Sequence, residues 1–183
     1  MALKVDPMVL VDLAKKVNPV AVISGTNGKT TTTNLVADCL QTAGVPLYCN
    51  REGNNLQSGI VTSLMLAPDT SKVVDAASAA QAPVGCFECD EMYTKYVLPR
   101  LRPHYFMLLN LFRDQLDRYG EVTHTLENIR IGISNSPNAT LCLNADDSLI
   151  ASLGRESRNP VLYFGVNVPI YQSRVAEVSD APY

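Results

Sequence analysis

Glycine, lysine and hydroxyl side chains stand together in the segment GTNGKT, which spans Gly25 to Thr30 and directly follows the apolar run VAVIS. Glycines allow a backbone to turn tightly, so successive N–H groups of a short loop can point inward at phosphate oxygens. A helix that starts at the loop adds the partial positive charge of its N-terminus. The spacing therefore predicts a phosphate-binding loop formed by the main chain from Gly25 to Lys29.

Two side chains of this loop fit a magnesium nucleotide. Lys29 supplies a full positive charge to the terminal phosphates, and the Thr30 hydroxyl can ligate Mg²⁺. The loop is a variant of the general P-loop, because Ile23 stands where that pattern has its first glycine. A glycine turn with a chance lysine is the alternative, but the order of strand, loop and helix favours ATP. The expected contacts are Gly25, Thr26, Asn27, Gly28, Lys29, Thr30 and Thr31.

A magnesium ion held between phosphates prefers oxygen ligands, so the loop needs a carboxylate opposite Thr30. Glu88 ends the apolar run PVGCFE and is our candidate for this ligand. Asp90 and Glu91 follow it, and two interpretations stay open for them. Capping of the next helix is favoured for Glu91, and support of the metal site is kept for Asp90.

A second polar cluster, NLFRDQLDRYGE, contains Asp114, Asp117 and Arg118. It follows a predicted strand, where the binding crevice of a parallel sheet is expected. A solvated turn with a surface ion pair explains the same residues equally well.

Apolar runs and helical periodicities alternate along the chain, and this alternation predicts an α/β fold. We expect a three-layer, P-loop-type and mainly parallel sheet with helices on both faces. The loops after Ser24, Glu88, Asn110 and Asn144 should meet at one edge. Predicted strands are Val20 to Ser24, Leu47 to Asn50, Val84 to Glu88, Tyr105 to Asn110, Thr140 to Asn144 and Val161 to Gly165. Predicted helices are Pro7 to Lys16, Thr30 to Ala43, Ser58 to Leu66, Met92 to Leu98 and Glu121 to Ser134.

The composition limits the classes of function. With 183 residues and 46% hydrophobic residues, one domain with a proper core is expected. A net charge of −3 argues against nucleic-acid partners. We find neither a signal peptide nor a membrane-spanning stretch, and five cysteines at irregular spacings fit a reducing cytoplasm. Cys86 and Cys89 form a CxxC, but a buried strand is favoured over a metal or redox site there.

Taken together, these motifs resemble the central ATPase domain of the Mur ligase family, which includes the peptidoglycan stem-peptide ligases and folylpolyglutamate synthase. The resemblance extends over nearly the whole chain, 1–183, in the family's order. It rests on GTNGKTTTT from Gly25, REGNN at Arg51 to Asn55, FECDE around Glu88, NLFRDQLDRYGE from Asn110 and LNADD at Leu143 to Asp147.

Two departures from the usual family pattern indicate one branch of it. Most members have a histidine in the DHLDR motif, where this sequence has Gln115. Most also have a carbamylated lysine in the next helix, and the matching place here is near Arg130. Both changes remove a means of holding a second magnesium and put a two-metal mechanism in doubt. The DQLDR form resembles the ligase-like subunits of lipid II isoglutaminyl synthases.

The resemblance also implies roles for single residues. Lys29 would contact the phosphates, and Thr30 and Glu88 would hold Mg²⁺, which makes Lys29 and Glu88 the expected catalytic pair. Asn55 would reach the nucleotide phosphates, and Asn144 would lie near the nucleoside.

The implied reaction is ATP-dependent amidation of lipid II at the membrane face of a bacterial cytoplasm, in peptidoglycan biosynthesis. A GatD-like glutaminase would supply the ammonia. The zinc ribbon and C-terminal domain of such proteins do not follow Tyr183, so we expect a fragment. Two alternatives stay open: another Mur-type ligase such as a folylpolyglutamate synthase, and a Mg-ATP-binding module without turnover.

Overall fold

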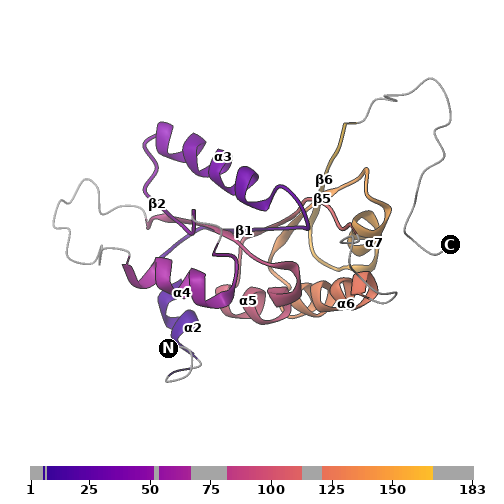
Figure 1. Cartoon of the computed structure of the whole chain (residues 1–183), viewed down its shortest axis with the longest axis horizontal. Coiled ribbons are helices and arrows are strands. Elements are labelled where there is room, and N and C mark those ends of the chain that lie inside the picture. The colour runs from indigo at the N-terminus through magenta and orange to yellow at the C-terminus, as the bar shows by residue number, and fades with distance from the viewer. Residues whose placement is uncertain (1–5, 7, 52–53, 67–81, 113–120, 167–183) are drawn as a thin grey trace.

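A parallel sheet forms the centre of the computed structural model, which describes residues 6, 8–51, 54–66, 82–112 and 121–166 (Figure 1). The sheet has six strands within these residues, in the order β2-β3-β1-β4-β5-β6, and every neighbouring pair is parallel. The strands are β1 (Val20–Ser24), β2 (Leu47–Cys49), β3 (Val84–Glu88), β4 (Tyr105–Leu108), β5 (Thr140–Asn144) and β6 (Val161–Phe164).

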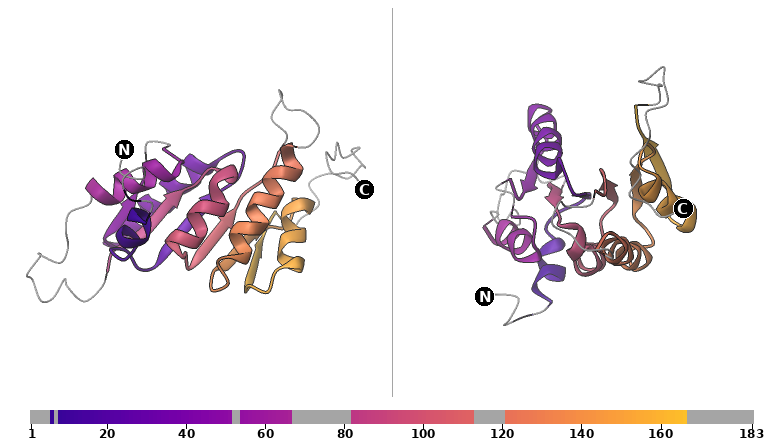
Figure 2. Two further views of the ribbon diagram at one scale, coloured as in Figure 1. Left: turned by 90° about the horizontal axis from the view of Figure 1, so that it is seen from below. Right: turned by 45° about the vertical axis from the view of Figure 1, so that its right-hand side comes forward.

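Helices cover both faces of the sheet, as the alternation predicts. Figure 1 shows α3 on one face and α2, α4, α5 and α6 on the other, and Figure 2 shows the same layers from two further sides. The helices are α2 (Val9–Ala14), α3 (Lys29–Thr42), α4 (Gln57–Leu66), the 3₁₀ helix η2 (Glu91–Tyr93), α5 (Thr94–Leu101), α6 (Glu121–Ser134) and α7 (Ser148–Glu156). Among the described residues, no helix combines the length and apolar character needed to cross a bilayer.

The neighbouring strands β1 and β3 are buried along most of their length, which explains their continuous apolar sequences. Val22 of β1 and Phe106 of β4 are pairing partners and have no exposed surface. Phe87 of β3 and Leu141 of β5 continue this buried layer on either side. The core therefore lies between the centre of the sheet and the helices that cover it, and it holds the strand ends in register.

Three strands and one helix have the predicted bounds: β1, β3, β5 and α6. Helix α7 was not predicted. Its start is nevertheless encoded locally, because the side chain of Asp147 accepts hydrogen bonds from the N–H groups of Leu149 and Ile150. Ile150 and Leu153, three residues apart, are the buried positions of this helix.

Candidate functional site

The loop between β1 and α3 has the backbone that its glycines predict. Gly25 has a φ of 135° and Gly28 a φ of 81°, both unfavourable for other residues. A Cβ on Gly25 would lie 3.0 Å from the main-chain N and O of Asn110. Gly28 is the N-cap of α3, and Lys29 is the first residue of that helix. The predicted order of strand, glycine loop and helix is confirmed.

The helix start, rather than the whole loop, presents N–H groups for an anion. Helical hydrogen bonding begins with the bond from Thr32 N to Gly28 O, so the N–H groups of Lys29, Thr30 and Thr31 have no acceptor inside the helix. The N–H of Thr26 instead donates to Asn110 O at 2.9 Å. This differs from the expectation that all amides from Gly25 to Lys29 face a phosphate. The carbonyl oxygen of Asn110, at the end of the neighbouring strand, accepts the N–H of Thr26 instead.

Asn110, directly after β4, is the residue that holds this loop in place. Its side-chain Oδ1 accepts from Asn27 N at 2.8 Å, and its Nδ2 donates to Asn27 O at 3.0 Å. Phe112 N donates to Thr26 Oγ1 at 3.1 Å. From the sequence, Asn110 is expected to end a strand and to begin the second polar cluster, without a role in the loop. The missed signal was a residue with both a donor and an acceptor at the end of the strand beside β1.

Lys29 lies within the loop and is largely buried, with 12% of its side chain exposed. Its ammonium donates to the carbonyl oxygens of Gly25 and Thr26 and to Glu91 Oε2, which lies 3.1 Å away. An ammonium has three N–H donors, and these three acceptors use all of them. The charge expected to meet phosphates is thus already positioned inside the loop.

Glu88 ends β3 beside β1, where Ile23 is its pairing partner. The residue is only 2% exposed. Its Oε1 accepts a long hydrogen bond of 3.4 Å from Asn55, while Oε2 is buried without a donor in the part of the chain that the structure describes. A buried carboxylate oxygen is costly unless a donor or a cation satisfies it. The carboxylate of Glu88 therefore suits a hard cation such as Mg²⁺.

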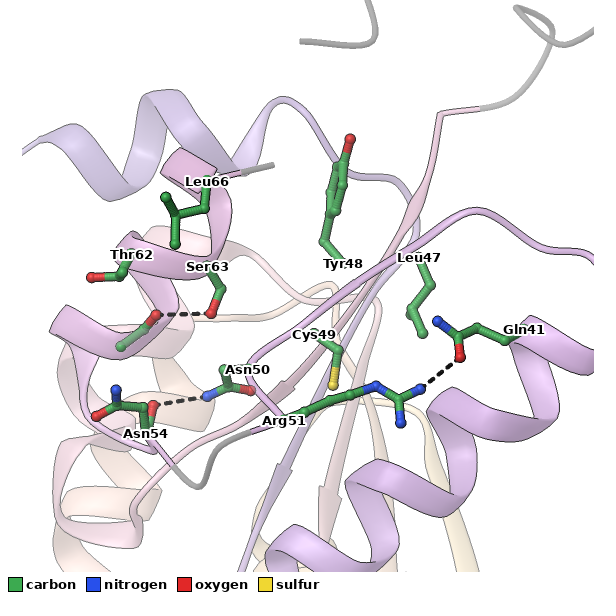
Figure 3. Close-up of a pocket in the computed structure, with 11 residues that line it drawn as sticks. Gln41, Leu47, Tyr48, Cys49, Asn50, Arg51, Asn54, Thr62, Ser63 and Leu66 are labelled. Carbon is green, nitrogen blue, oxygen red and sulfur yellow. Dashed lines mark hydrogen bonds between the residues drawn. The ribbon is translucent and has the colours of Figure 1, made fainter. Parts of the chain in front are cut away.

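Asn50 fixes the position of Glu88 from the neighbouring strand. Its Oδ1 accepts from Glu88 N at 2.8 Å, and its Nδ2 donates to Glu88 O and to Asn54 O, each at 2.9 Å. Asn50 also lines a cavity of about 430 Å³ between β2, α4 and the end of α3, where Figure 3 shows its bond to Asn54. Sequence reasoning missed this residue, because a bond between positions 38 apart is invisible in a local pattern.

The structure assigns the capping role to Asp90 and not to Glu91. Asp90 is the N-cap of η2, and its Oδ1 accepts from Met92 N at 2.9 Å. Burial raises the pKa of the Asp90 carboxyl. Glu91 makes the ion pair with Lys29 instead of capping. The capping preference for Glu91 is therefore wrong, because the helix starts one residue earlier than the predicted Met92.

Asn144 lies at the same edge, but the nitrogen and the oxygen of its side-chain amide both form hydrogen bonds within the protein. Nδ2 donates to Leu109 O at 2.8 Å, and Oδ1 accepts from Asp146 N at 3.0 Å. Asp147 Oδ2 accepts from Leu111 N at 3.0 Å. These contacts confirm that the loops after β1, β3, β4 and β5 meet at one edge. A contact of Asn144 with the nucleoside stays a prediction.

The remaining candidates lie elsewhere. Cys86 faces Cys49 across β3 and β2, and Cys89 follows the end of β3, with its Sγ donating to Asp90 O at 3.3 Å. Arg130 bonds Glu156 through two nitrogens, at 2.8 and 3.2 Å, and so faces α7. Residues 113–120 of the second polar cluster are outside the described residues, and they include Asp114, Gln115, Asp117 and Arg118.

Residues 23–181 match the model of the Mur ligase middle domain. Among curated relatives, the chain is 32% identical over 182 residues to the lipid II isoglutaminyl synthase (glutamine-hydrolyzing) subunit MurT of Staphylococcus aureus (strain N315). It is 33% identical over 167 residues to the subunit of the same name from Streptococcus pneumoniae (strain ATCC BAA-255 / R6). These alignments cover 100% and 91% of the chain but only 39% and 35% of the relatives.

Solved structures show the same fold. MurF ligase from Thermotoga maritima, solved in complex with ADP, matches with a TM-score of 0.69 at 19% identity, over 90% of this chain and 37% of that one. MurF from Acinetobacter baumannii also gives a TM-score of 0.69, at 16% identity, over 86% of this chain and 34% of that one. The six-stranded parallel sheet, the glycine loop and the match over residues 23–181 agree, and the chain belongs to the Mur ligase family through its middle domain.

Proposed function

We propose that this chain binds ATP as a magnesium complex at the loop between β1 and α3. The observation that supports this is the place of Glu88, which ends a strand next to β1 with one carboxylate oxygen buried and, among the described residues, without a hydrogen-bond donor. Thr30 and Glu88 would hold Mg²⁺, which would neutralise charge on the terminal phosphates. The free N–H groups at the start of α3 and the ammonium of Lys29 would bind the phosphates themselves.

The first test concerns Lys29. Mg-ATP should raise the melting temperature of the chain, because a ligand that binds only the folded state stabilises it. Lys29→Ala should abolish this shift. Lys95→Ala is a matched control, since Lys95 lies over the ring of Tyr96, 4.9 Å from its centroid, and makes no ion pair among the described residues. A full shift in Lys29→Ala would exclude the loop as the binding site.

The second test concerns the metal. Titration of Mg²⁺ at fixed ATP should show a weaker magnesium dependence for Glu88→Ala. Asp114→Asn, in the cluster outside the described residues, should have the smaller effect. Equal effects of the two substitutions would rule out Glu88 as the principal ligand.

For the whole protein we propose an amide ligase subunit of peptidoglycan biosynthesis. A carboxylate oxygen of the substrate attacks the γ-phosphorus of ATP, ADP leaves, and an acyl phosphate forms. Ammonia then attacks the acyl carbon, its nitrogen loses a proton, and phosphate leaves to give the amide. The residues described here would supply positioning and charge neutralisation to the first step.

The proposed substrate is the α-carboxylate of D-glutamate in lipid II, with ammonia from a GatD-like glutaminase. Support comes from relatives named as MurT subunits of a glutamine-hydrolysing lipid II isoglutaminyl synthase. Because the chain spans about two fifths of their length, the assay needs the full-length parent protein with its glutaminase. Glutamine-dependent amidation of lipid II is the expected result. Intact ATP binding without amidation would favour another Mur-type ligase.

A further inference from the structure

Glu91 has no part in the function proposed above, yet among the described residues it makes the only ion pair with Lys29. Its Oε2 lies 3.1 Å from Lys29 Nζ, and 16% of its side chain is exposed. The pair is therefore mostly screened from water, unlike the surface pair of Arg51 and Asp38. A charge pair in such surroundings interacts more strongly than one in bulk solvent.

The backbone around Glu91 is held from several sides. Asp90 caps η2 through its bond from Met92 N, and Thr94 Oγ1 donates to Glu91 O at 2.8 Å. The sulfur of Met92 accepts from Thr125 Oγ1 at 3.1 Å, which joins η2 to α6. Since capping, turn and packing all fix this short helix, the carboxylate of Glu91 is delivered to Lys29 by a rigid element rather than by a flexible surface side chain.

The position of Glu91 conflicts with phosphate binding. A triphosphate brings several negative charges to the ammonium that Glu91 already neutralises, so the two anions compete for Lys29. The carbonyl oxygens of Gly25 and Thr26 hold the same ammonium from the loop side. Phosphate oxygens can therefore replace Glu91 as the third acceptor while Lys29 keeps its place in the loop.

We propose that Glu91 is a positioning residue that holds Lys29 in the empty loop and is displaced from it by the phosphates of the nucleotide. The proposal rests on the function proposed above, because it requires phosphates to bind at this loop. In this proposal Glu91 orders the loop and neutralises the charge of Lys29 before the nucleotide binds, and it thereby lowers the affinity of the loop for phosphates. Glu91→Gln keeps the shape of the side chain but removes the competing charge, so it should bind phosphates more tightly.

Calorimetry with Mg-ATP and with magnesium tripolyphosphate, which has no nucleoside, tests this directly. We expect Glu91→Gln to lower the dissociation constant of both by about fivefold to tenfold. Asp38→Asn, which breaks the surface pair with Arg51, should leave both constants unchanged. A merely structural role of Glu91 would weaken binding, so equal or weaker binding by the variant overturns the proposal. Absence of Mg-ATP binding by the wild-type chain would instead overturn the proposed function.

The pair can also be tested without a nucleotide. We expect the melting-temperature shifts of Glu91→Gln and Lys29→Met to be non-additive in the double variant, because either substitution alone breaks the same contact. Additive shifts would show that the two residues do not interact in the empty protein, and would overturn the proposal independently of any ligand.

Discussion

The side chain of Asn110 bonds both polar groups of the Asn27 main chain, and so joins the loop after β1 to the end of β4. The two residues are 83 positions apart. Their strands are adjacent and parallel, which brings the two loops to the same edge of the sheet. The conformation of the phosphate loop therefore depends on a residue outside the glycine motif.

Asn110→Ala should loosen the phosphate loop. The substitution removes two hydrogen bonds to the exposed main chain of Asn27, and each such bond contributes about 0.5–1.5 kcal/mol. We expect a lower stability in urea denaturation and an affinity for Mg-ATP about tenfold weaker. Asn135→Ala is the control, since Asn135 bonds Ile131 O at the exposed end of α6. Similar losses in both variants would contradict a special role of Asn110.

Gly25→Ala should be much more damaging than the same change at another glycine with positive φ. At Gly25 a Cβ would meet the Asn110 backbone at 3.0 Å in addition to the strained φ of 135°. We expect a loss of about 2–4 kcal/mol in free energy of unfolding. Gly44→Ala is the control, because a Cβ there meets nothing within 4 Å and only the strain at φ 73° remains. The expected loss for it is about 1 kcal/mol.

Asn50→Ala should disturb Glu88 without touching its side chain. It leaves the buried N–H and carbonyl of Glu88 unpaired, so we expect a loss of about 2–3 kcal/mol in stability. The magnesium dependence of ATP binding should weaken as well. Asn54→Ala keeps the carbonyl that accepts from Asn50 and should change neither quantity. A normal magnesium titration of folded Asn50→Ala would contradict the role of Asn50 in holding Glu88.

The stability of the chain should depend on the charge of Asp90. Burial raises the pKa of this carboxyl in the folded state above its ordinary value of 3.8. The folded protein therefore binds this proton more readily than the unfolded chain, and stability from this group is present at low pH and decreases as pH rises through the folded pKa. Asp90→Asn should lack this decrease while an amide oxygen remains for Met92 N. If the free energies of unfolding of the wild-type chain and of Asp90→Asn change in parallel between pH 4 and 7, a contribution of Asp90 to the pH dependence is excluded.

Sequence patterns predicted the parts of the fold that are encoded locally. The buried runs of β1, β3 and β5 have unmistakable apolar sequences, and Gly25 and Gly28 mark the turn between β1 and α3. The carboxyl ends of parallel strands meet at one edge, so the convergence of loops followed from topology alone. The position of Glu88 beside β1 is a consequence of the same rule.

Contacts between distant segments could not be predicted in this way. Asn110 and Asn50 act on backbone groups 83 and 38 positions away, and polar residues at strand ends have many other uses. Whether Asp90 or Glu91 caps the helix depends on a start that differs by one residue, which propensities do not resolve. The missed roles of Asn110 and Asn50 and the wrong choice of capping residue have the same cause. Each depends on which hydrogen-bond or ion-pair partner a polar group meets once the strands are in place.

The bonds of Asn110, together with the bond from Phe112 N to Thr26, make the segments after β1 and β4 one mechanical unit. A molecule that binds to one segment and moves it must also move the other segment or break the hydrogen bonds between them. Two ligands that contact these two segments would therefore bind with coupled rather than independent affinities.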